Sequence, residues 1–313
     1  MRPAEPDPAC TGVGNRDDRY YHSMHAHGWC GFLPYWSIRM THAHAHTPIA
    51  LTIAGSDSGG GAGIQADLKT FSALGVFGTS VITALTAQNT REVRAIHDVP
   101  PAFIADQLNT VLDDIHIDAI KIGMLSRPET ITTIATILRD RGLRNIVLDP
   151  VMVAKSGDKL LADESVEALR SELLPLATLI TPNLPESAVL LGAPEATDTD
   201  AMLTQARELL AMGPQAVLVK GGHLTDSASD DSADLLLMDG QTHWLPAKRI
   251  PTANTHGTGC TLSSAIAAGL ARGRDMHTAV AKAKTYITAA ITAADRLQVG
   301  SGHGPTHHFH AWW

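Results

Sequence analysis

Residues 252–261 read Thr-Ala-Asn-Thr-His-Gly-Thr-Gly-Cys-Thr and lead directly into Leu-Ser-Ser-Ala-Ile-Ala-Ala-Gly-Leu at 262–270. Gly257 and Gly259 can adopt backbone angles that a Cβ atom would forbid. The small and apolar residues that follow predict a helix, whose first N–H groups have no partner within it and carry partial positive charge. Such a start can bind an anion. The pattern is equally typical of a glycine turn before a core helix, with Cys260 as a small buried side chain.

From residue 49 onward the chain alternates predicted strands and helices. Short apolar runs predict strands at 49–54, 81–87, 118–124, 145–150, 176–181 and 216–221. Helical spacing predicts helices at 64–74, 100–112, 127–141, 165–173, 185–191, 200–212, 261–271 and 276–297. Asp239-Gly240, between strand-like segments at 233–238 and 242–246, is typical of a type I′ hairpin. The order predicts one α/β domain with a mostly parallel sheet covered on both faces.

The ends of the predicted strands carry polar or small residues. In open parallel sheets, ligands bind beyond the carboxyl ends of the strands. The residues at those ends are Gly55, Gln88, Met124, Asp149, Asn183 and Gly221. We therefore expect a binding site along this edge of the sheet.

The composition is that of a globular chain without affinity for polyanions. No apolar run approaches the roughly 20 residues that a membrane-spanning helix needs. The formal net charge of -8 leaves no basic surface for nucleic acid or for an acidic membrane. Cys10, Cys30 and Cys260 are too few and too scattered for a disulfide framework or a zinc site. We expect a cytoplasmic protein that binds no nucleic acid and no membrane.

Both ends of the chain differ from its middle. Residues 1–47 are rich in Pro, Gly, His and aromatic residues, without the basic and apolar regions of a signal peptide. His42, His44 and His46 alternate and could hold a metal ion, but a disordered or loosely ordered extension is the simpler expectation. Residues 300–313 are rich in Gly and His and predict a loose C-terminal tail. Residues 48–299 remain as the folded domain.

Two common nucleotide-binding patterns are absent or incomplete. Residues 61–66 match Gly-x-Gly-x-x-Ala between a strand and a helix, as in dinucleotide-binding proteins. The acidic residue expected at the end of the next strand is replaced by Gln88-Asn89, which argues against a Rossmann dehydrogenase. No Gly-x-x-x-x-Gly-Lys-Ser/Thr occurs, which argues against a P-loop enzyme.

Seven motifs, in this order along the chain, narrow the range of possible functions further. They are GSD with GGAGIQAD at 55–67, ALTAQN at 84–89, KIGML at 121–125, DPVMVAKSG at 149–157, TPN-x-x-E at 181–186, VKGGH at 219–223 and NTHGTGC at 254–260. From about residue 49 to 297 the chain resembles the hydroxymethylpyrimidine/phosphomethylpyrimidine kinases of thiamine biosynthesis, in the ribokinase-like superfamily. Gly59 departs from the serine common in that family, which loosens the loop but removes no expected ligand.

The resemblance implies a fold, a reaction and an assembly. It implies a ribokinase-like α/β/α fold of three layers, and a homodimer. It implies ATP-dependent phosphorylation of 4-amino-5-hydroxymethyl-2-methylpyrimidine (HMP) to its monophosphate and then to its diphosphate, with Mg²⁺. Phosphoryl transfer accumulates negative charge, so aimed N–H donors, a cation and Mg²⁺ are what the reaction requires.

The turn at the helix start receives the catalytic roles by this resemblance. Gly257, Thr258 and Gly259 would supply N–H donors to the moving phosphoryl group. Cys260 stands where sugar kinases of the superfamily carry an aspartate base. Because a thiol at a helix N-terminus has a lowered pKa, we expect Cys260 to act as a thiolate base.

The other site residues follow from the same resemblance, each beside a structural alternative. The expected substrate ligands are Gln88, Gly55, Asp67, Met124 and Val151, and the expected ATP ligands are Lys220, Asn183, Asp149 and Lys155. Glu186 and Asn183 would orient Mg²⁺ through water. Gln88 could instead be a structural cap, Asp67 could cap or pair within its helix, and Lys220 could be a solvated strand end. Glu186 could simply favour the helix dipole.

Two other functions remain open. A pyridoxal or pyridoxine kinase has the same fold and a substrate with a similar hydroxymethyl group. A binding or regulatory module without catalysis is the second alternative, and the presence of Cys260, Lys220 and Glu186 argues against it.

Overall fold

The computed structural model describes residues 46–152, 163–222 and 233–313. The strands in this part of the chain form one sheet in the order β3-β2-β1-β4-β5-β6-β7-β8-β9. Their bounds are β1 Ile49–Ser56, β2 Phe77–Gln88, β3 Val93–Asp98, β4 Ala119–Ile122, β5 Ile146–Leu148, β6 Leu179–Ile180, β7 Ala216–Val219, β8 Asp234–Met238 and β9 Gln241–Leu245. The order changes direction between β1 and β4, which is the place where open α/β sheets bind ligands.

The sheet is parallel in its centre and antiparallel at both edges. Strands β2, β1, β4, β5, β6 and β7 pair in parallel, whereas β3, β8 and β9 pair antiparallel. The sequence did not indicate β3, because its run Val-Arg-Ala-Ile-His-Asp mixes apolar and charged residues over six positions. The hairpin between β8 and β9 is confirmed, since Asp239 and Gly240 both have positive φ, as a type I′ turn requires.

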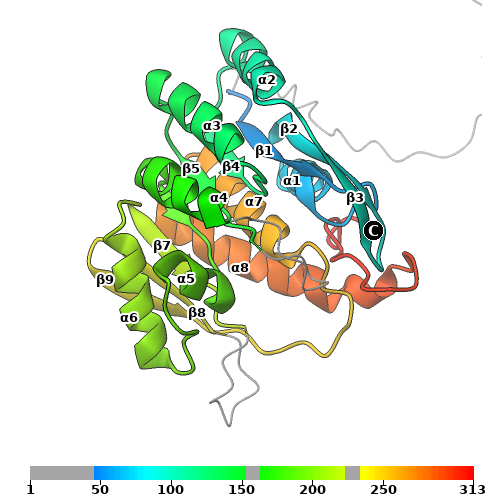
Figure 1. Cartoon of the computed structure of the whole chain (residues 1–313). Helices are drawn as coiled ribbons and strands as arrows, with labels where there is room; N and C mark the ends of the chain where they lie inside the picture. Colours follow the sequence, from blue (N-terminus) through cyan, green and yellow to red (C-terminus); the bar gives the residue numbers. More distant parts are fainter. Residues whose placement is uncertain (1–45, 153–162, 223–232) are drawn as a thin grey trace, which may run out of the picture. The chain divides into compact units, whose positions relative to one another are not determined.

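Helices cover both faces of the sheet, as Figure 1 shows. Their bounds are α1 Gly63–Ala73, α2 Pro101–Asp114, α3 Pro128–Asp140, α4 Asp163–Ala168, α5 Leu184–Leu191, α6 Thr199–Leu210, α7 Thr258–Ala271 and α8 Met276–Thr292. Buried side chains of α1, α7 and α8 form one cluster, and those of α2, α3, α5 and α6 form the other. The predicted three-layer α/β/α fold is therefore confirmed.

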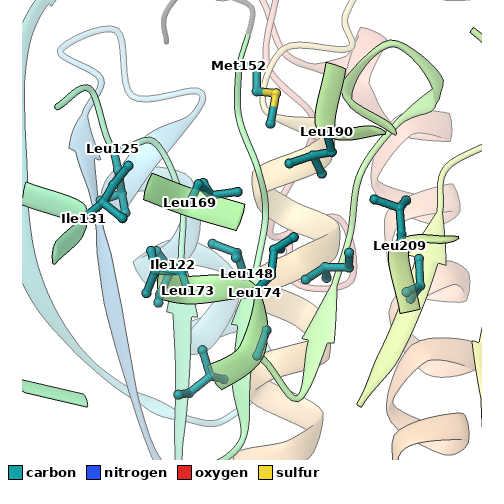
Figure 2. Close-up of a cluster of buried hydrophobic side chains, with 14 of the residues drawn as sticks. Ile122, Leu125, Ile131, Leu148, Met152, Leu169, Leu173, Leu174, Leu190 and Leu209 are labelled. Carbon is teal, nitrogen blue, oxygen red and sulfur yellow. The ribbon is translucent and has the colours of Figure 1, made fainter. Parts of the chain in front are cut away.

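The central strands alternate between these two clusters because successive side chains of a strand point to opposite faces. In β1, Ala50 belongs to the cluster of α7 and Leu51 to the opposite one, and Ala119 and Ile120 divide in the same way in β4. Figure 2 shows the larger cluster, in which Ile122 and Leu148 meet leucines of the covering helices. The small side chains on the α7 side let that helix lie close to the sheet.

Helix α7 begins three residues earlier than the sequence predicted. Its N-cap is Gly257, with φ 78°. A Cβ atom on Gly257 would lie 1.8 Å from the carbonyl oxygen of Gly61, so only glycine fits this contact. Thr258, Gly259 and Cys260 therefore form the first helical turn, whose N–H groups have no partner within the helix; the Thr258 N–H donates to the Thr255 carbonyl before it at 3.3 Å.

Two predicted helices are interrupted near their ends. The predicted helix 165–173 is the short α4 followed by a π-helical turn at Leu169–Leu173 and a 3₁₀ turn at Leu174–Leu176. The predicted helix 276–297 ends at Thr292, and a 3₁₀ turn follows at Ala294–Arg296. No helix among residues 46–152, 163–222 and 233–313 has the length and apolarity needed to cross a membrane.

The expectation of a loose C-terminal tail is wrong for residues 303–308. Thr306 and His307 are buried, and the His307 N–H donates to the carbonyl of Ala290. The backbone of His256 donates to Gly304 O and accepts from Thr306 N–H. The sequence suggested a tail because the segment has no helical or strand periodicity. Its backbone groups instead form hydrogen bonds with residues that are distant along the chain, which no local pattern can indicate.

His308 links this C-terminal segment to α7. Its ring lies 3.1 Å from the hydroxyl of Thr261, and its carbonyl accepts a hydrogen bond from the Tyr286 hydroxyl at 2.6 Å. Burial, with the positive charge of Lys69 adding to it, lowers the pKa of His308 to about 3. The folded protein therefore holds His308 neutral.

We expect this burial to make stability depend on pH. Below pH 6.5 the unfolded chain protonates His308 and the folded chain does not, so acidification favours unfolding by about 1.4 kcal/mol per pH unit down to the folded pKa. Thermal or denaturant unfolding between pH 7.5 and 5.5 measures this dependence. His308→Gln should reduce the slope, whereas His116→Gln, on the surface, should leave it unchanged. An equal slope in His308→Gln would contradict the assignment.

Candidate active site

A cavity of about 890 Å³ lies at the carboxyl ends of the parallel strands. The predicted strand-end residues Gly55, Gln88, Met124, Asp149 and Asn183 line it, together with the first turn of α7. The sequence placed these residues at separate strand ends, and the structure brings them together.

The middle of the cavity is the start of α7. Gly257, Thr258, Gly259 and Cys260 all line it. Gly259 passes close to charged groups, because a Cβ atom there would lie 3.4 Å from both Asp149 Oδ2 and Lys220 Nζ. Backbone N–H groups with a lysine beside them make this position suitable for an anion.

Lys220 pairs with two acidic side chains at this position. Its Nζ lies 2.9 Å from Asp149 Oδ1 and 3.6 Å from Glu186 Oε2. Burial alone would lower the pKa of Lys220, but the two carboxylates raise it overall, so the ammonium stays charged. The alternative prediction, that Lys220 is a solvated lysine at a strand end, is wrong, because its side chain is only 17% exposed.

The pKa values of the two carboxylates are shifted in opposite directions. Asp149 is nearer to Lys220 and also accepts from the Thr181 hydroxyl at 2.9 Å. Burial would raise the pKa of Asp149, but Lys220 and Lys121 lower it overall. Burial raises the pKa of Glu186 to about 7, and repulsion by Asp149 adds to this while Lys220 opposes it.

Asn183 and Glu186 form the N-terminal cap of α5. The Asn183 side chain accepts from Glu186 N–H at 2.8 Å, and Glu186 Oε2 accepts from Asn183 N–H at 2.7 Å. This capping box satisfies two N–H groups of the helix start. Glu186 therefore stabilises the start of its helix, as the structural alternative predicted. The same side chain also lies beside Lys220 in the cavity.

The expectation of a lowered pKa at Cys260 is wrong. Desolvation raises the pKa of the Cys260 thiol to about 11, although the nearby Lys121 ammonium opposes this. The negative charges of Asp67 and Asp149 add to the increase. The helix start is too weak an attraction to offset these effects, so the thiol is protonated at neutral pH.

Asp67, an expected substrate ligand, lies beneath the cavity and does not line it. Its carboxylate is fully buried and accepts from Lys121 at 2.9 Å, from Thr52 at 2.6 Å and from Ser264 at 2.6 Å. These partners come from β4, β1 and α7. Asp67 therefore ties α1 to the sheet and to α7, and it binds the Lys121 ammonium.

Lys121 is a buried cation, and the sequence analysis assigned no role to it. Its side chain is fully buried and reaches the floor of the cavity near Cys260. Burial would lower the pKa of Lys121, but Asp67 raises it overall. The sequence feature that could have indicated this buried charge is a lysine in an otherwise apolar strand, within the motif at 121–125.

Four of the five expected substrate ligands line the cavity. Gly55, Gln88, Met124 and Val151 all line it, and Val93 and Ile96 of β3 add apolar surface. A Cβ atom on Gly55 would lie 2.6 Å from Met124 Cε, so a larger residue there would displace the end of the flexible Met124 side chain. The Gln88 side chain is half-buried, and its amide faces Thr86 and His256.

Asp57 and His256 lie within the sequence motifs, but the sequence did not predict a function for either residue. His256 Nε2 lies 2.9 Å from Asp57 Oδ2, and both residues line the cavity. Burial would raise the pKa of Asp57, but the hydrogen bond with His256 and the N–H groups of Ala62 and Gly59 lower it overall. The carboxylate is therefore ionised.

The other end of the cavity was not foreseen in the sequence. It is lined by residues 247–252, by the apolar side chains Leu262, Ile287 and Ile291, and by the ion pair of Asp234 with Lys284, whose atoms lie 2.6 Å apart. Apolar side chains with charged groups beside them are suited to a flat ring attached to phosphates. Lys155, an expected ATP ligand, lies outside the described residues.

The arrangement has the parts that phosphoryl transfer requires. The start of α7 lines one cavity together with two lysines and two carboxylates, Lys121, Lys220, Asp149 and Glu186. Among the described residues no cluster of three or more His, Cys, Asp or Glu could hold a metal by itself. Mg²⁺ needs no such cluster, since one or two carboxylates, water and substrate phosphates bind it.

Comparisons with known proteins agree with this geometry. The family model described as phosphomethylpyrimidine kinase matches residues 57–307. A hydroxymethylpyrimidine/phosphomethylpyrimidine kinase of Rhizobium meliloti is 59% identical over 268 residues, covering 85% of this chain and 99% of its own.

Two solved structures are similar over most of the chain. A phosphomethylpyrimidine kinase from Clostridium difficile is 46% identical with a TM-score of 0.69, covering 78% of this chain and 99% of its own. The ADP complex of Bacillus subtilis pyridoxal kinase is 39% identical with a TM-score of 0.77, covering 84% and 98%. The chain is therefore a kinase that belongs to the phosphomethylpyrimidine kinase family.

Proposed function

We propose that this kinase transfers the γ-phosphoryl group of ATP to the hydroxymethyl group of HMP, and then phosphorylates the monophosphate to the diphosphate, in thiamine biosynthesis. The observation that carries the proposal is the start of α7, which lines one cavity with Gln88, Met124 and Val151 and also with Leu262, Ile287 and Ile291. The family name and the relatives described above support the substrate.

The ring pocket suits an aminopyrimidine. Met124, Val151 and Ile96 offer apolar surface to the faces of a ring. The Gln88 amide can donate and accept at once, and so can the adjacent ring nitrogen and amino group of HMP. We propose that Gln88 pairs with this edge of the ring and that Gly55 leaves room for it.

The second pocket and its neighbours would bind ATP. Leu262, Ile287 and Ile291 would contact the adenine ring, and Lys220 would pair with phosphate oxygens. The N–H groups of Gly257, Thr258 and Gly259 would stabilise the charge that develops on the transferred group. Lys121 supplies a further positive charge beneath them.

We propose that Glu186 and Asp149 bind Mg²⁺ together with the phosphates, partly through water. Both carboxylates face the anion position and both are within 3.6 Å of the Lys220 ammonium. The oxygen donors and their small number suit this ion. When bound, Mg²⁺ would neutralise phosphate charge during transfer.

We propose that Cys260 accepts the proton of the attacking hydroxyl group. It occupies the first turn of α7, in the wall between the two pockets. Because its pKa is about 11, only a small fraction is thiolate at neutral pH. In a loose transition state the hydroxyl loses its proton late, so a base in low abundance can still serve.

A pyridoxal kinase is the second candidate. The similarity to the Bacillus subtilis pyridoxal kinase, at 39% identity, favours it specifically. The two substrates differ at the ring edge that faces Gln88. Comparing their turnover therefore separates the two candidates.

The direct test of the proposed function is a product assay with ATP and either ring. We expect HMP to give monophosphate first and diphosphate later, with kcat/KM at least tenfold above that for pyridoxal. Chromatographic separation of the two phosphates gives the time course. Turnover of pyridoxal well above that of HMP would overturn the proposal.

The role of Cys260 predicts a pH dependence. If the thiolate is the reacting form, kcat should rise by about tenfold per pH unit between pH 7 and 9, since the pKa lies near 11. Cys260→Ala should lower kcat by about a hundredfold or more and remove this rise, with little change in the KM for HMP. Cys260→Ser controls for the shape of the side chain. An alanine variant with the original rate and pH profile would exclude Cys260 from the reaction.

The pKa of Glu186 predicts a pH-dependent affinity for Mg²⁺. Below pH 7 the carboxyl group must lose a proton to bind the ion, so the affinity should fall by about tenfold per pH unit and be constant above pH 7. Calorimetric titration of Mg²⁺ into the protein with ADP measures it. Glu186→Gln should weaken binding and abolish the pH dependence. Glu129→Gln, in the first turn of α3, is the matched control. Unchanged Mg²⁺ binding in Glu186→Gln would refute the assignment.

A further inference from the structure

Asp234 and Lys284 form an ion pair in the wall of the cavity, and the proposed reaction has given it no role. Lys284 Nζ donates to Asp234 Oδ2 at 2.6 Å, and both residues line the cavity. The Asp234 carboxylate is buried, and the Lys284 side chain is only 14% exposed. Removing these charges from water costs free energy that their mutual attraction does little more than offset. Such a pair in a cavity wall is a candidate for a functional role.

The other oxygen of Asp234 binds the backbone beside Lys220. Asp234 Oδ1 accepts from the Gly221 N–H at 3.1 Å, and this bond is buried. The N–H belongs to the peptide bond that joins Lys220 to Gly221. Because a peptide bond is planar, the Asp234 carboxylate fixes the whole peptide group that follows the Lys220 Cα atom.

This hydrogen bond lies where the regular pairing between β7 and β8 has ended. The last pair of that ladder is Val219 with Leu235, and β8 begins at Asp234. Gly221 is so close to the chain before β8 that a Cβ atom on it would lie 2.1 Å from the Ala233 carbonyl oxygen. A buried N–H group needs an acceptor, and the Asp234 side chain supplies it here.

Lys220 is consequently held at its backbone as well as at its ammonium. Its own N–H donates to Pro182 O at 2.8 Å, and its Nζ donates to Asp149 at 2.9 Å. A lysine side chain has many rotamers, and fixing it in advance lowers the entropy that binding a ligand would cost. The bond from Asp234 to Gly221 is therefore part of what prepares Lys220 for an anion.

Lys284 supports this bond by favouring the ionised form of Asp234. Burial raises the pKa of the Asp234 carboxyl group overall, and the Lys284 ammonium is the main effect that opposes the increase. An ionised carboxylate accepts a hydrogen bond from an N–H group more strongly than a neutral acceptor does. The contacts thus form a chain from α8 through Asp234 to the peptide group after Lys220.

We propose that Asp234 and Lys284 are positioning residues for nucleotide binding: together they hold the Lys220–Gly221 peptide group and thereby place the Lys220 ammonium for the phosphates of ATP. This inference rests on the proposed function, in which Lys220 pairs with phosphate oxygens. Lys284 acts through Asp234 and needs no contact of its own with the phosphates.

The test compares AMP-PCP, an analogue of ATP, with adenosine, which lacks phosphates. Calorimetric titration without HMP should show that the wild-type protein binds AMP-PCP with Mg²⁺ about a hundredfold or more tightly than adenosine. Asp234→Ala should reduce this preference by about tenfold or more, with the affinities for adenosine and HMP largely unchanged. In turnover, the KM for ATP should rise and the KM for HMP should not. Lys282→Gln, at an exposed residue of α8, is the control.

A neutral pair separates positioning from direct attraction of phosphate by the Lys284 charge. When Asp234→Asn is combined with Lys284→Gln, the asparagine oxygen can accept from the Gly221 N–H and its NH₂ group can donate to the glutamine. We expect this double variant to recover most of the AMP-PCP preference that Lys284→Gln alone loses. Because the two side chains act as a unit, the losses from Asp234→Ala and Lys284→Gln should be far from additive.

The outcomes distinguish this inference from the proposed function. If the neutral pair loses as much preference as Lys284→Gln alone, the Lys284 charge acts on the phosphates directly and the inference is overturned. Full preference in Asp234→Ala or in Lys284→Gln also overturns it. Should circular dichroism show that Asp234→Ala does not fold, Lys284→Gln and the neutral pair provide the comparison without it. A wild-type protein that binds AMP-PCP no more tightly than adenosine would instead refute the proposed binding of ATP phosphates at Lys220.

Discussion

The backbones of Gly257 and Gly61 touch, with room for no Cβ atom between them. This contact brings the loop after β1 against the turn that begins α7, and it requires the left-handed conformation of Gly257. Because of it, Asp57 meets His256 and the first N–H groups of α7 open into the cavity. The shape of the cavity on both sides of this turn depends on how closely these two loops approach. Asp67 secures the same arrangement from below, since its carboxylate binds Ser264 of α7 and Lys121 of β4.

Buried charge sets the chemistry of the site. Lys121 and Lys220 are both held in the charged form by carboxylates, and both lie next to the start of α7. Burying an ion pair contributes little to stability compared with apolar packing. Such pairs are common where a function needs charge in a dry place. The same low polarity explains why Glu186 and Cys260 have raised pKa values, and why the helix start does not make Cys260 a thiolate.

The fold and much of the candidate site could be read from the chain. Apolar strands buried on both faces, and glycines where loops meet helices, are local features, so the parallel centre of the sheet and most helices were predicted correctly. Strand β3 was missed because an exposed edge strand buries few side chains and leaves little apolar pattern. The second pocket was missed because residues 247–252 have no regular structure, and its apolar wall comes from α7 and α8, which read as ordinary core helices.

What the sequence determined by itself was the set of strand-end residues and the glycine turn, since these depend on neighbours along the chain. What only the tertiary structure decided was which charges meet and which are buried. Asp67 turned from an expected ligand into a support for Lys121, and the supposed tail became the segment that holds His256. Protonation and pairing depend on atoms that are close in space and distant in sequence, so no local pattern of residues contains them.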